Sequence, residues 1–146
     1  MKGCSNAVIE LSSANYFKRP YYGLNLGADQ NKVSKLYKVS DSATSERIAF
    51  QSVLDCLQFK TFWIEWDIEV VRVGRGNDVG KGVFITSIID NCPIIVNSVW
   101  ISSIPSEVVS WKFLYISGIQ NTYIYIYYNN LYFLLGFLMK WLLKRR

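Results

Sequence analysis

The hydrophobic pattern of residues 1–116 is typical of short β-strands separated by turns. Runs rich in Val, Ile, Tyr, Phe and Trp are separated by clusters of Gly, Asn, Asp, Ser and Pro, which is how strands and turns alternate in β proteins. The pattern predicts strands near Ala7–Leu11, Tyr21–Leu26, Val33–Tyr37, Ile48–Leu54, Phe59–Trp66, Val70–Val73, Gly82–Ile88, Ile94–Ile101 and Val108–Ile116. Because no long window before Thr122 keeps an apolar period of about 3.6 residues, we expect few helices.

Alternation inside these runs predicts sheets that bury one face. Phe62, Ile64 and Trp66 occupy alternate positions of one run, and Val71 and Val73 do so in the next. Side chains two residues apart on a strand share a face. Many short strands of this kind predict a mainly β fold, an antiparallel β-sandwich or jelly roll whose two apolar faces form the core.

The net charge of the chain is concentrated near its C-terminus. The 146 residues, 51% of them apolar, are enough for one domain with one core. The formal net charge is +5, but acidic and basic side chains are equal in number up to residue 111. The excess comes from Lys112, Lys140, Lys144, Arg145 and Arg146. Since affinity for nucleic acid depends on neutralising phosphates, we expect the neutral domain not to bind nucleic acid.

The chain contains no histidine, which excludes several kinds of catalysis. Ser-His-Asp and Cys-His mechanisms, histidine acid–base chemistry and histidine-ligated zinc all need an imidazole. Glu65, Asp67 and Glu69 form an alternating acidic row, with basic residues close by in the sequence. We interpret this row as a solvated face with cross-strand pairs, so the sequence predicts no catalytic residue and no metal site.

The cysteines do not form a metal-binding motif. Cys4, Cys56 and Cys92 are far apart, without a CxxC sequence or a fourth thiol, so a four-cysteine metal site is excluded. One interpretation is that all are small buried apolar side chains. The alternative is a disulfide between Cys4 and Cys56. Residues 1–20 contain no long apolar run, so we expect no secretory signal peptide.

The glycine-rich segment Gly74–Gly82 has two interpretations. Glycine-rich loops that follow a strand can hold phosphate groups, but they need the N-terminus of a helix behind them. Here Lys81 is followed by Gly82 instead of Ser or Thr, and the next residues, Val83–Thr86, form another β run. We therefore expect the glycines to let two strands reverse tightly.

The central segment resembles a known domain family. The blocks Phe62–Trp66, Val71–Gly76 and Gly80–Phe84 are together similar to the farnesoic acid O-methyltransferase domain, which occurs widely in invertebrate proteins. Further similar segments are Cys4–Ser12, Tyr22–Ala28, Asn31–Ser34, Pro93–Ile94, Asn97–Val99 and Trp111–Phe113. The resemblance covers about residues 1–116, so we predict one domain there and a hydrophobic, basic tail at residues 117–146. The family name implies methyl transfer from S-adenosylmethionine to farnesoic acid, a juvenile-hormone precursor.

Two functions stay open for this domain. The favoured hypothesis is a non-catalytic, lectin-like module without a cofactor, which binds a carbohydrate, lipid or protein. Trp63, if its face is exposed, would supply a flat stacking surface, and Arg72, Asn77 and Asp78 would supply hydrogen bonds. An interpretation of Trp63 as a core residue stays open, and we expect Trp66 in the core. The alternative is an S-adenosylmethionine-dependent O-methyltransferase acting on farnesoic acid, although the chain is short and poor in the βαβ units of Rossmann-type methyltransferases.

The tail has three interpretations. Residues 123–143 contain a single charged side chain, Lys140, and precede Lys144–Arg146, which fits one membrane-spanning helix with a cytoplasmic C-terminus. Asn129, Asn130 and the alternating Tyr and Ile of residues 123–128 argue against insertion. The segment could instead be an amphipathic helix or strand packed on the domain. The third interpretation is translated AT-rich noncoding sequence, which has a similar composition.

Overall fold

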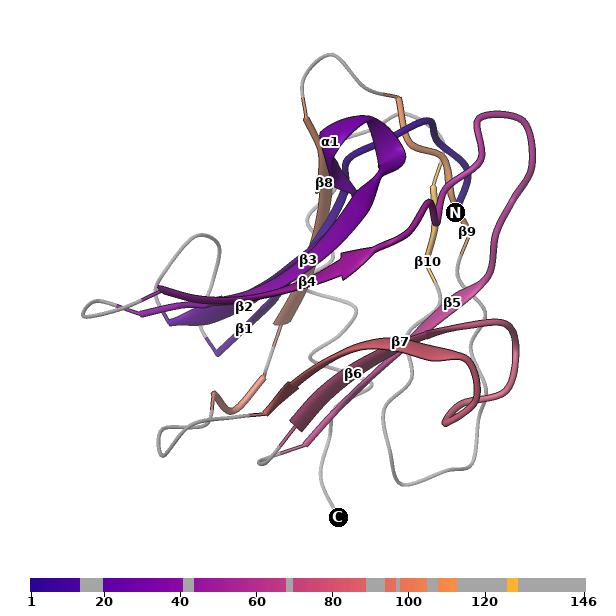
Figure 1. Cartoon of the computed structure of the whole chain (residues 1–146). Coiled ribbons are helices and arrows are strands. Elements are labelled where there is room, and N and C mark those ends of the chain that lie inside the picture. Colours follow the sequence, from indigo (N-terminus) through magenta and orange to yellow (C-terminus); the bar gives the residue numbers. More distant parts are fainter. Residues whose placement is uncertain are drawn as a thin grey trace.

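The described part of the chain is almost entirely β. The computed structural model describes residues 1–13, 20–40, 44–67, 70–88, 94–96, 98–104, 108–112 and 126–128. Their elements, shown in Figure 1, are β1 (Ala7–Ser12), β2 (Tyr21–Gly27), α1 (Ala28–Asn31), β3 (Val33–Val39), β4 (Thr44–Phe50), β5 (Phe62–Trp66), β6 (Val70–Arg75), β7 (Val83–Ile88), β8 (Ser98–Ser103), β9 (Trp111–Lys112) and β10 (Ile126–Tyr128). The prediction of many short strands and few helices is confirmed for these residues.

The strands form antiparallel sheets in two main layers. The larger sheet has five strands in the order β4-β3-β2-β1-β8, and the smaller has three in the order β5-β6-β7. Strands β3 and β4 of the larger sheet lie close to β7 of the smaller one, and Figure 1 shows the larger sheet above the smaller. Strands β9 and β10 form a separate pair. This arrangement confirms the predicted antiparallel β-sandwich.

The core lies between the two main sheets and follows the alternation in the sequence. On β1 the buried side chains are Ala7, Ile9 and Leu11, and the residues between them are partly exposed. On β6 the side chains of Val71 and Val73 are both 0% exposed. Burying a side chain of this size contributes about 1.5–3 kcal/mol, so the alternating residues of both sheets provide the main stabilisation of the fold.

Strand boundaries differ from the predicted ones where the chain passes between the sheets. The predicted strand Ile48–Leu54 is β4, which ends at Phe50, and the next strand begins at Phe62 instead of Phe59. The reason is the side chain of Asn31. Its Oδ1 accepts hydrogen bonds from the backbone N–H groups of Val53 at 3.1 Å and Leu54 at 3.0 Å. Its Nδ2 donates to the carbonyl oxygen of Leu54 at 2.9 Å. The predicted strand Ile94–Ile101 likewise begins later, as β8 at Ser98.

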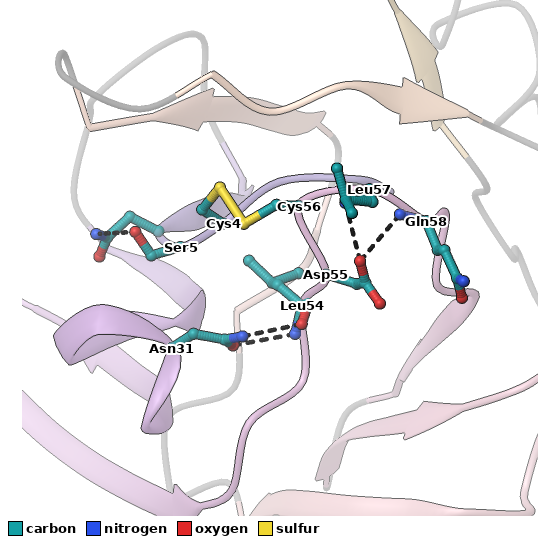
Figure 2. Close-up of a disulfide and its surroundings, with 9 residues drawn as sticks. Cys4, Ser5, Asn31, Leu54, Asp55, Cys56, Leu57 and Gln58 are labelled. Atoms are coloured by element: carbon teal, nitrogen blue, oxygen red, sulfur yellow. Dashed lines mark hydrogen bonds between the residues drawn. A yellow bond between two sulfur atoms is a disulfide. The ribbon is translucent and has the colours of Figure 1, made fainter.

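The segment held by Asn31 continues into a tight turn at Asp55 (Figure 2). Asp55 Oδ1 accepts hydrogen bonds from the backbone N–H groups of Leu57 at 2.8 Å and Gln58 at 3.0 Å. These two bonds, together with Lys60, lower the pKa of the Asp55 carboxyl. The turn places Cys56 beside the N-terminal segment.

The structure joins Cys4 to Cys56 by a disulfide (Figure 2). Both cysteines are exposed, so the interpretation of these two residues as buried apolar thiols is wrong, and the bonded alternative is what the structure contains. Backbone hydrogen bonds reinforce the connection, because Gly3 N–H donates to the carbonyl oxygen of Asp55 at 3.1 Å. Cys92 lies outside the described residues.

The glycine-rich segment forms the reversal between β6 and β7, as predicted. Gly76, Gly80 and Gly82 have φ values of 94°, 86° and 63°, which residues other than glycine rarely adopt. The backbone N–H of Arg75 donates to the carbonyl oxygen of Gly82 at 3.0 Å and closes the hairpin. The segment therefore joins two antiparallel strands, and no helix follows it.

Only a small part of the predicted tail is described. Residues Ile126–Tyr128 form β10, which pairs with β9, and the rest of residues 117–146 lies outside the described residues. The predicted membrane span, residues 123–143, therefore falls almost wholly outside them, as does the end of the predicted strand Val108–Ile116. Within the described ranges, no helix has the length and apolar character needed to cross a membrane.

Candidate binding surfaces

The structure buries Trp63, so the condition for a stacking surface at this residue, an exposed face, is not met. Its side chain is 1% exposed. The indole lies against Gly74, the residue directly opposite on β6, where an added Cβ would overlap the ring. The indole Nε1–H donates to the carbonyl oxygen of Lys81 at 2.9 Å. Trp63 therefore ties β5 and β6 to the loop that follows them. Trp66 packs against the core, as expected.

The other predicted binding residues are accessible, and two of them are paired with neighbouring charges. Arg72 Nη1 lies 2.9 Å from Glu65 Oε2, its direct cross-strand neighbour, which confirms the expected pairing on this face. Asp78 Oδ2 lies 3.1 Å from Lys81 Nζ within the exposed β6–β7 loop, which also contains Asn77. Arg72 thus lies on the sheet and the other two lie in the loop. Their role in ligand binding stays a prediction.

A second surface, which the sequence reasoning did not identify, lies on the five-stranded sheet. We call it the outer face, because it is turned away from the core. On β1, β2, β3 and β8 its residues alternate with buried ones, and on β4 it continues through the exposed Glu46 and Ile48. The residues of the outer face are Val8, Glu10, Tyr21, Asn25, Lys35, Tyr37, Glu46, Ile48 and Trp100, all partly or fully exposed.

The strand register aligns one row of this outer face across all five strands. Trp100 lies opposite Glu10, and Glu10 lies opposite Gly23. Gly23 in turn lies opposite Tyr37, and Tyr37 lies opposite Glu46. Directly opposed residues of antiparallel strands have Cβ atoms about 4.5–5.5 Å apart. Two aromatic rings and two carboxylates are therefore neighbours in a single row.

Tyr37 reaches across its neighbouring strand because the residue beside it is glycine. A Cβ built on Gly23 would overlap the ring and the hydroxyl of Tyr37, so only glycine allows the ring to lie there. The ring therefore extends from β3 over Gly23 on β2, and Glu10 lies opposite Gly23 on the next strand, β1. The side chain of Tyr37 remains partly exposed. An aromatic surface is thus presented on the outer face of the sheet.

Burial and the neighbouring carboxylates raise the pKa of the Tyr37 hydroxyl. Burial is the largest cause of its raised pKa, followed by Glu10, with Tyr21 and Glu46 adding to it. Burial also raises the pKa of Glu10 above its ordinary value of 4.5. Glu46 differs from Glu10, because its Oε1 lies 3.4 Å from Lys35 Nζ. The row therefore contains a phenol that can donate a hydrogen bond, one neutralised carboxylate, and one carboxylate in a half-buried position.

The sequence contained part of the signal for the outer face. Glu10 and Tyr37 stand at outward positions of two strands that were correctly predicted to begin at Ala7 and Val33. The missing information was the register between strands, which brings residues 10, 23, 37 and 100 together. Within the described ranges, no group of Cys, Asp and Glu residues has the arrangement of a metal site.

The fold and its two sheet faces define an antiparallel β-sandwich domain with an aromatic and acidic surface on its larger sheet. The chain belongs to the farnesoic acid O-methyltransferase family, because the model of that family matches residues 1–129 of the 146. The match continues past residue 116 and includes the β9–β10 pair. Comparisons with curated proteins and with solved structures found no match.

Proposed function

We propose that this domain is a non-catalytic carbohydrate-binding module and that the outer face of the five-stranded sheet is its binding site. The observation that carries the proposal is the position of Tyr37, whose ring covers Gly23 and lies in the row between Glu10 and Glu46. Sugar rings present faces of C–H groups, which stack on aromatic rings. Their hydroxyl groups donate hydrogen bonds, which carboxylates accept.

The other aromatic residues of the outer face fit the same class of ligand. Trp100 lies at one end of the row, opposite Glu10, and Tyr21 lies beside Gly23 on β2. Neighbouring strands are about 4.8 Å apart, so the row spans about 19 Å across five strands. This is longer than a single sugar ring and suits an oligosaccharide lying across the strands.

A lipid ligand such as a farnesyl chain is less well supported. Pockets for small apolar ligands typically have volumes of about 300–1,000 Å³. One apolar space between the two sheets, lined by described residues such as Leu11, Tyr22, Ile64 and Val73, is too small to admit a water molecule. A ligand at the described surface would therefore lie on the sheet instead of between the sheets.

The described residues also do not fit the cofactor that the family name implies. A Rossmann-type methyltransferase binds S-adenosylmethionine at a glycine-rich turn between a strand and a helix. Here the glycine-rich segment joins the antiparallel strands β6 and β7. We therefore favour recognition over methyl transfer, and methyl transfer to farnesoic acid is the competing function that an experiment has to exclude.

Three measurements on the full chain test this proposal. We expect binding on a glycan array, no heat on titration with S-adenosylmethionine, and no transfer of a radiolabelled methyl group to farnesoic acid. We expect Tyr37→Ala to lose the glycan signal and the matched loop variant Asp78→Ala to retain it. Methyl transfer above the background of a protein-free control, or glycan binding unchanged by Tyr37→Ala, would overturn the proposal.

A further inference from the structure

We infer that the carbohydrate recognised by the outer face carries a cationic amino group, which binds beside the carboxylate of Glu10. This inference rests on the proposed carbohydrate-binding function and names the chemistry of its ligand. It follows from the surroundings of Glu10, which differ from those of the other carboxylate in the same row.

The described residues that face Glu10 carry no positive charge. On its own strand the outward neighbours are Val8 and Ser12. On β2 the residues facing it are Gly23, directly opposite, with Tyr21 and Asn25 on either side. On β8 they are Trp100, directly opposite, with Ser98 and Ser102 on either side. Glu10 is therefore surrounded by small, aromatic and neutral polar groups from every adjacent strand.

Lys35, the lysine of the outer face, is already engaged by the other carboxylate. Lys35 Nζ lies 3.4 Å from Glu46 Oε1, on the opposite side of Tyr37. Glu46 is thus neutralised by a neighbour in the protein, whereas the described neighbours of Glu10 provide no such partner. Of the two carboxylates in the row, only Glu46 is compensated by a described cation. The remaining negative charge therefore lies at the Glu10 end of the row.

The position of Glu10 makes a cation a better partner than a neutral hydroxyl group. The carboxylate is half-buried, and burial raises its pKa, which means that its surroundings disfavour the charged form. A hydroxyl group can donate a hydrogen bond, but it leaves the charge uncompensated. An ammonium group supplies both a hydrogen bond and the opposite charge, and such charged hydrogen bonds are about twice as strong as neutral ones.

The distance between strands suits an amino group attached directly to a stacked sugar ring. The Tyr37 ring covers Gly23 on β2, and Glu10 stands on the adjacent strand β1, about 4.8 Å away. A sugar on the Tyr37 ring therefore places its ring substituents next to the Glu10 carboxylate. The two aromatic rings nearby, Tyr37 and Trp100, also attract cations through their faces.

The test compares two oligosaccharides with the same sugar skeleton and linkage. One is an oligomer of glucosamine, which is cationic at mildly acidic pH, and the other is the corresponding oligomer of N-acetylglucosamine, which is neutral. Binding of each to the full chain is measured by calorimetry at low ionic strength. We expect the cationic oligomer to bind about tenfold more tightly or better, and the difference to shrink as salt is added.

Two matched variants localise the effect. Glu10→Gln keeps the shape of the side chain and one acceptor oxygen but removes the negative charge, and we expect it to remove the preference for the cationic oligomer. Glu65→Gln makes the same chemical change on the outside of the smaller sheet, where Glu65 pairs with Arg72, and we expect it to preserve the preference. Circular dichroism of both variants shows whether they remain folded, and the ratio of the two affinities is read within each variant.

The outcomes separate this inference from the proposed function. Equal or tighter binding of the neutral oligomer would overturn the inference and leave carbohydrate binding intact. A preference that survives in Glu10→Gln would overturn the role of Glu10. Comparable binding of a lysine-rich peptide without any sugar would overturn the requirement for a carbohydrate, and failure to bind any saccharide would contradict both proposals.

Discussion

The two sheets of this domain use the same arrangement of residues for different purposes. Each places an aromatic residue directly opposite a glycine, Tyr37 opposite Gly23 in the larger sheet and Trp63 opposite Gly74 in the smaller. In both pairs the ring occupies the space that a Cβ at the glycine would need. Trp63 is 1% exposed and donates a hydrogen bond to Lys81, whereas Tyr37 is partly exposed between two carboxylates.

The comparison shows that a glycine opposite an aromatic residue does not by itself define a binding surface. The difference lies in what surrounds the ring. The indole of Trp63 has its polar atom satisfied by the backbone, so it contributes to the fold. The Tyr37 ring is partly exposed beside two carboxylates, and burial, followed by Glu10, Tyr21 and Glu46, raises the pKa of its hydroxyl, so it can contribute to recognition. Substitutions at the two pairs should therefore separate stability from binding.

The largest effect on stability is expected from Trp63→Ala. Removing a buried aromatic side chain costs about 3–5 kcal/mol, and the carbonyl oxygen of Lys81 also loses its donor. Denaturant unfolding followed by fluorescence or circular dichroism measures the change. A loss below about 1 kcal/mol, in the range of ordinary surface substitutions, would mean that Trp63 does not support the fold.

Breaking the disulfide is expected to destabilise the domain, because Cys4 lies before β1 of the larger sheet and Cys56 lies before β5 of the smaller one. Cys4 and Cys56 are 52 residues apart in the sequence, and the chain-entropy model gives about 4 kcal/mol for closing a loop of that length. We expect the double variant Cys4→Ser, Cys56→Ser to be destabilised by about 2–5 kcal/mol and to bind carbohydrate normally while folded. Mass spectrometry without reducing agent provides the control, and free thiols at both Cys4 and Cys56 in the native protein would contradict the pairing.

An alanine substitution should lower the stability of the fold at Gly74 and should abolish ligand binding at Gly23. Gly74→Ala forces the buried indole to move and break its bond to Lys81, so we expect a loss of about 1–3 kcal/mol. In Gly23→Ala the partly exposed Tyr37 ring can rotate away from the new methyl group. Alanine also lowers the conformational entropy of the unfolded chain, which offsets about 0.4–1 kcal/mol of the lost stability. We expect Gly23→Ala to abolish glycan binding with little change in unfolding free energy. Equal destabilisation by the two substitutions would remove the distinction between the pairs.

Glu10 makes the stability of the larger sheet depend on pH. Because the pKa of Glu10 is raised in the folded protein, the folded state binds the proton more tightly than the unfolded state does. This contribution to stability is present below the ordinary value of 4.5 and is lost as the pH rises through the folded pKa. We expect Glu10→Gln to remove this decline, as measured by unfolding between mildly acidic and neutral pH. An unchanged pH profile would mean that Glu10 is not buried in solution.

The smallest effect is expected at the ion pair between Glu65 and Arg72. Both side chains are partly exposed, and such pairs contribute about 0.2–1 kcal/mol. A double-mutant cycle with Glu65→Gln and Arg72→Ala should give a coupling in that range and no change in glycan affinity. Loss of glycan binding in Arg72→Ala would instead assign the ligand to the smaller sheet.

The fold could be predicted from the sequence where local alternation was strong. Strands β1, β2, β3 and β6 begin at the predicted residues, because period-two patterns identify strands and their buried faces. Strand β4 ends earlier than predicted because Asn31, far from it in the sequence, binds the backbone at Val53 and Leu54. No local pattern contains that information.

The binding surface was harder to predict than the fold, for a related reason. Trp63 could not be recognised as a buried residue until the register placed Gly74 opposite it. Tyr37 could not be associated with Glu10 until Gly23 was known to lie between them. A glycine beside an aromatic residue has meaning only across strands, and a single sequence does not contain the register.

The most direct test of the account is to map which sheet the ligand contacts. Isotope-labelled protein is titrated with whichever of the two oligosaccharides binds more tightly, and the backbone amide signals are followed by NMR. The account predicts the largest shifts at Glu10, Gly23 and Tyr37 on the outer face, with little change at Asn77 and Asp78 in the β6–β7 loop. Shifts concentrated at Asn77 and Asp78, or no saturable shifts at all, would contradict it.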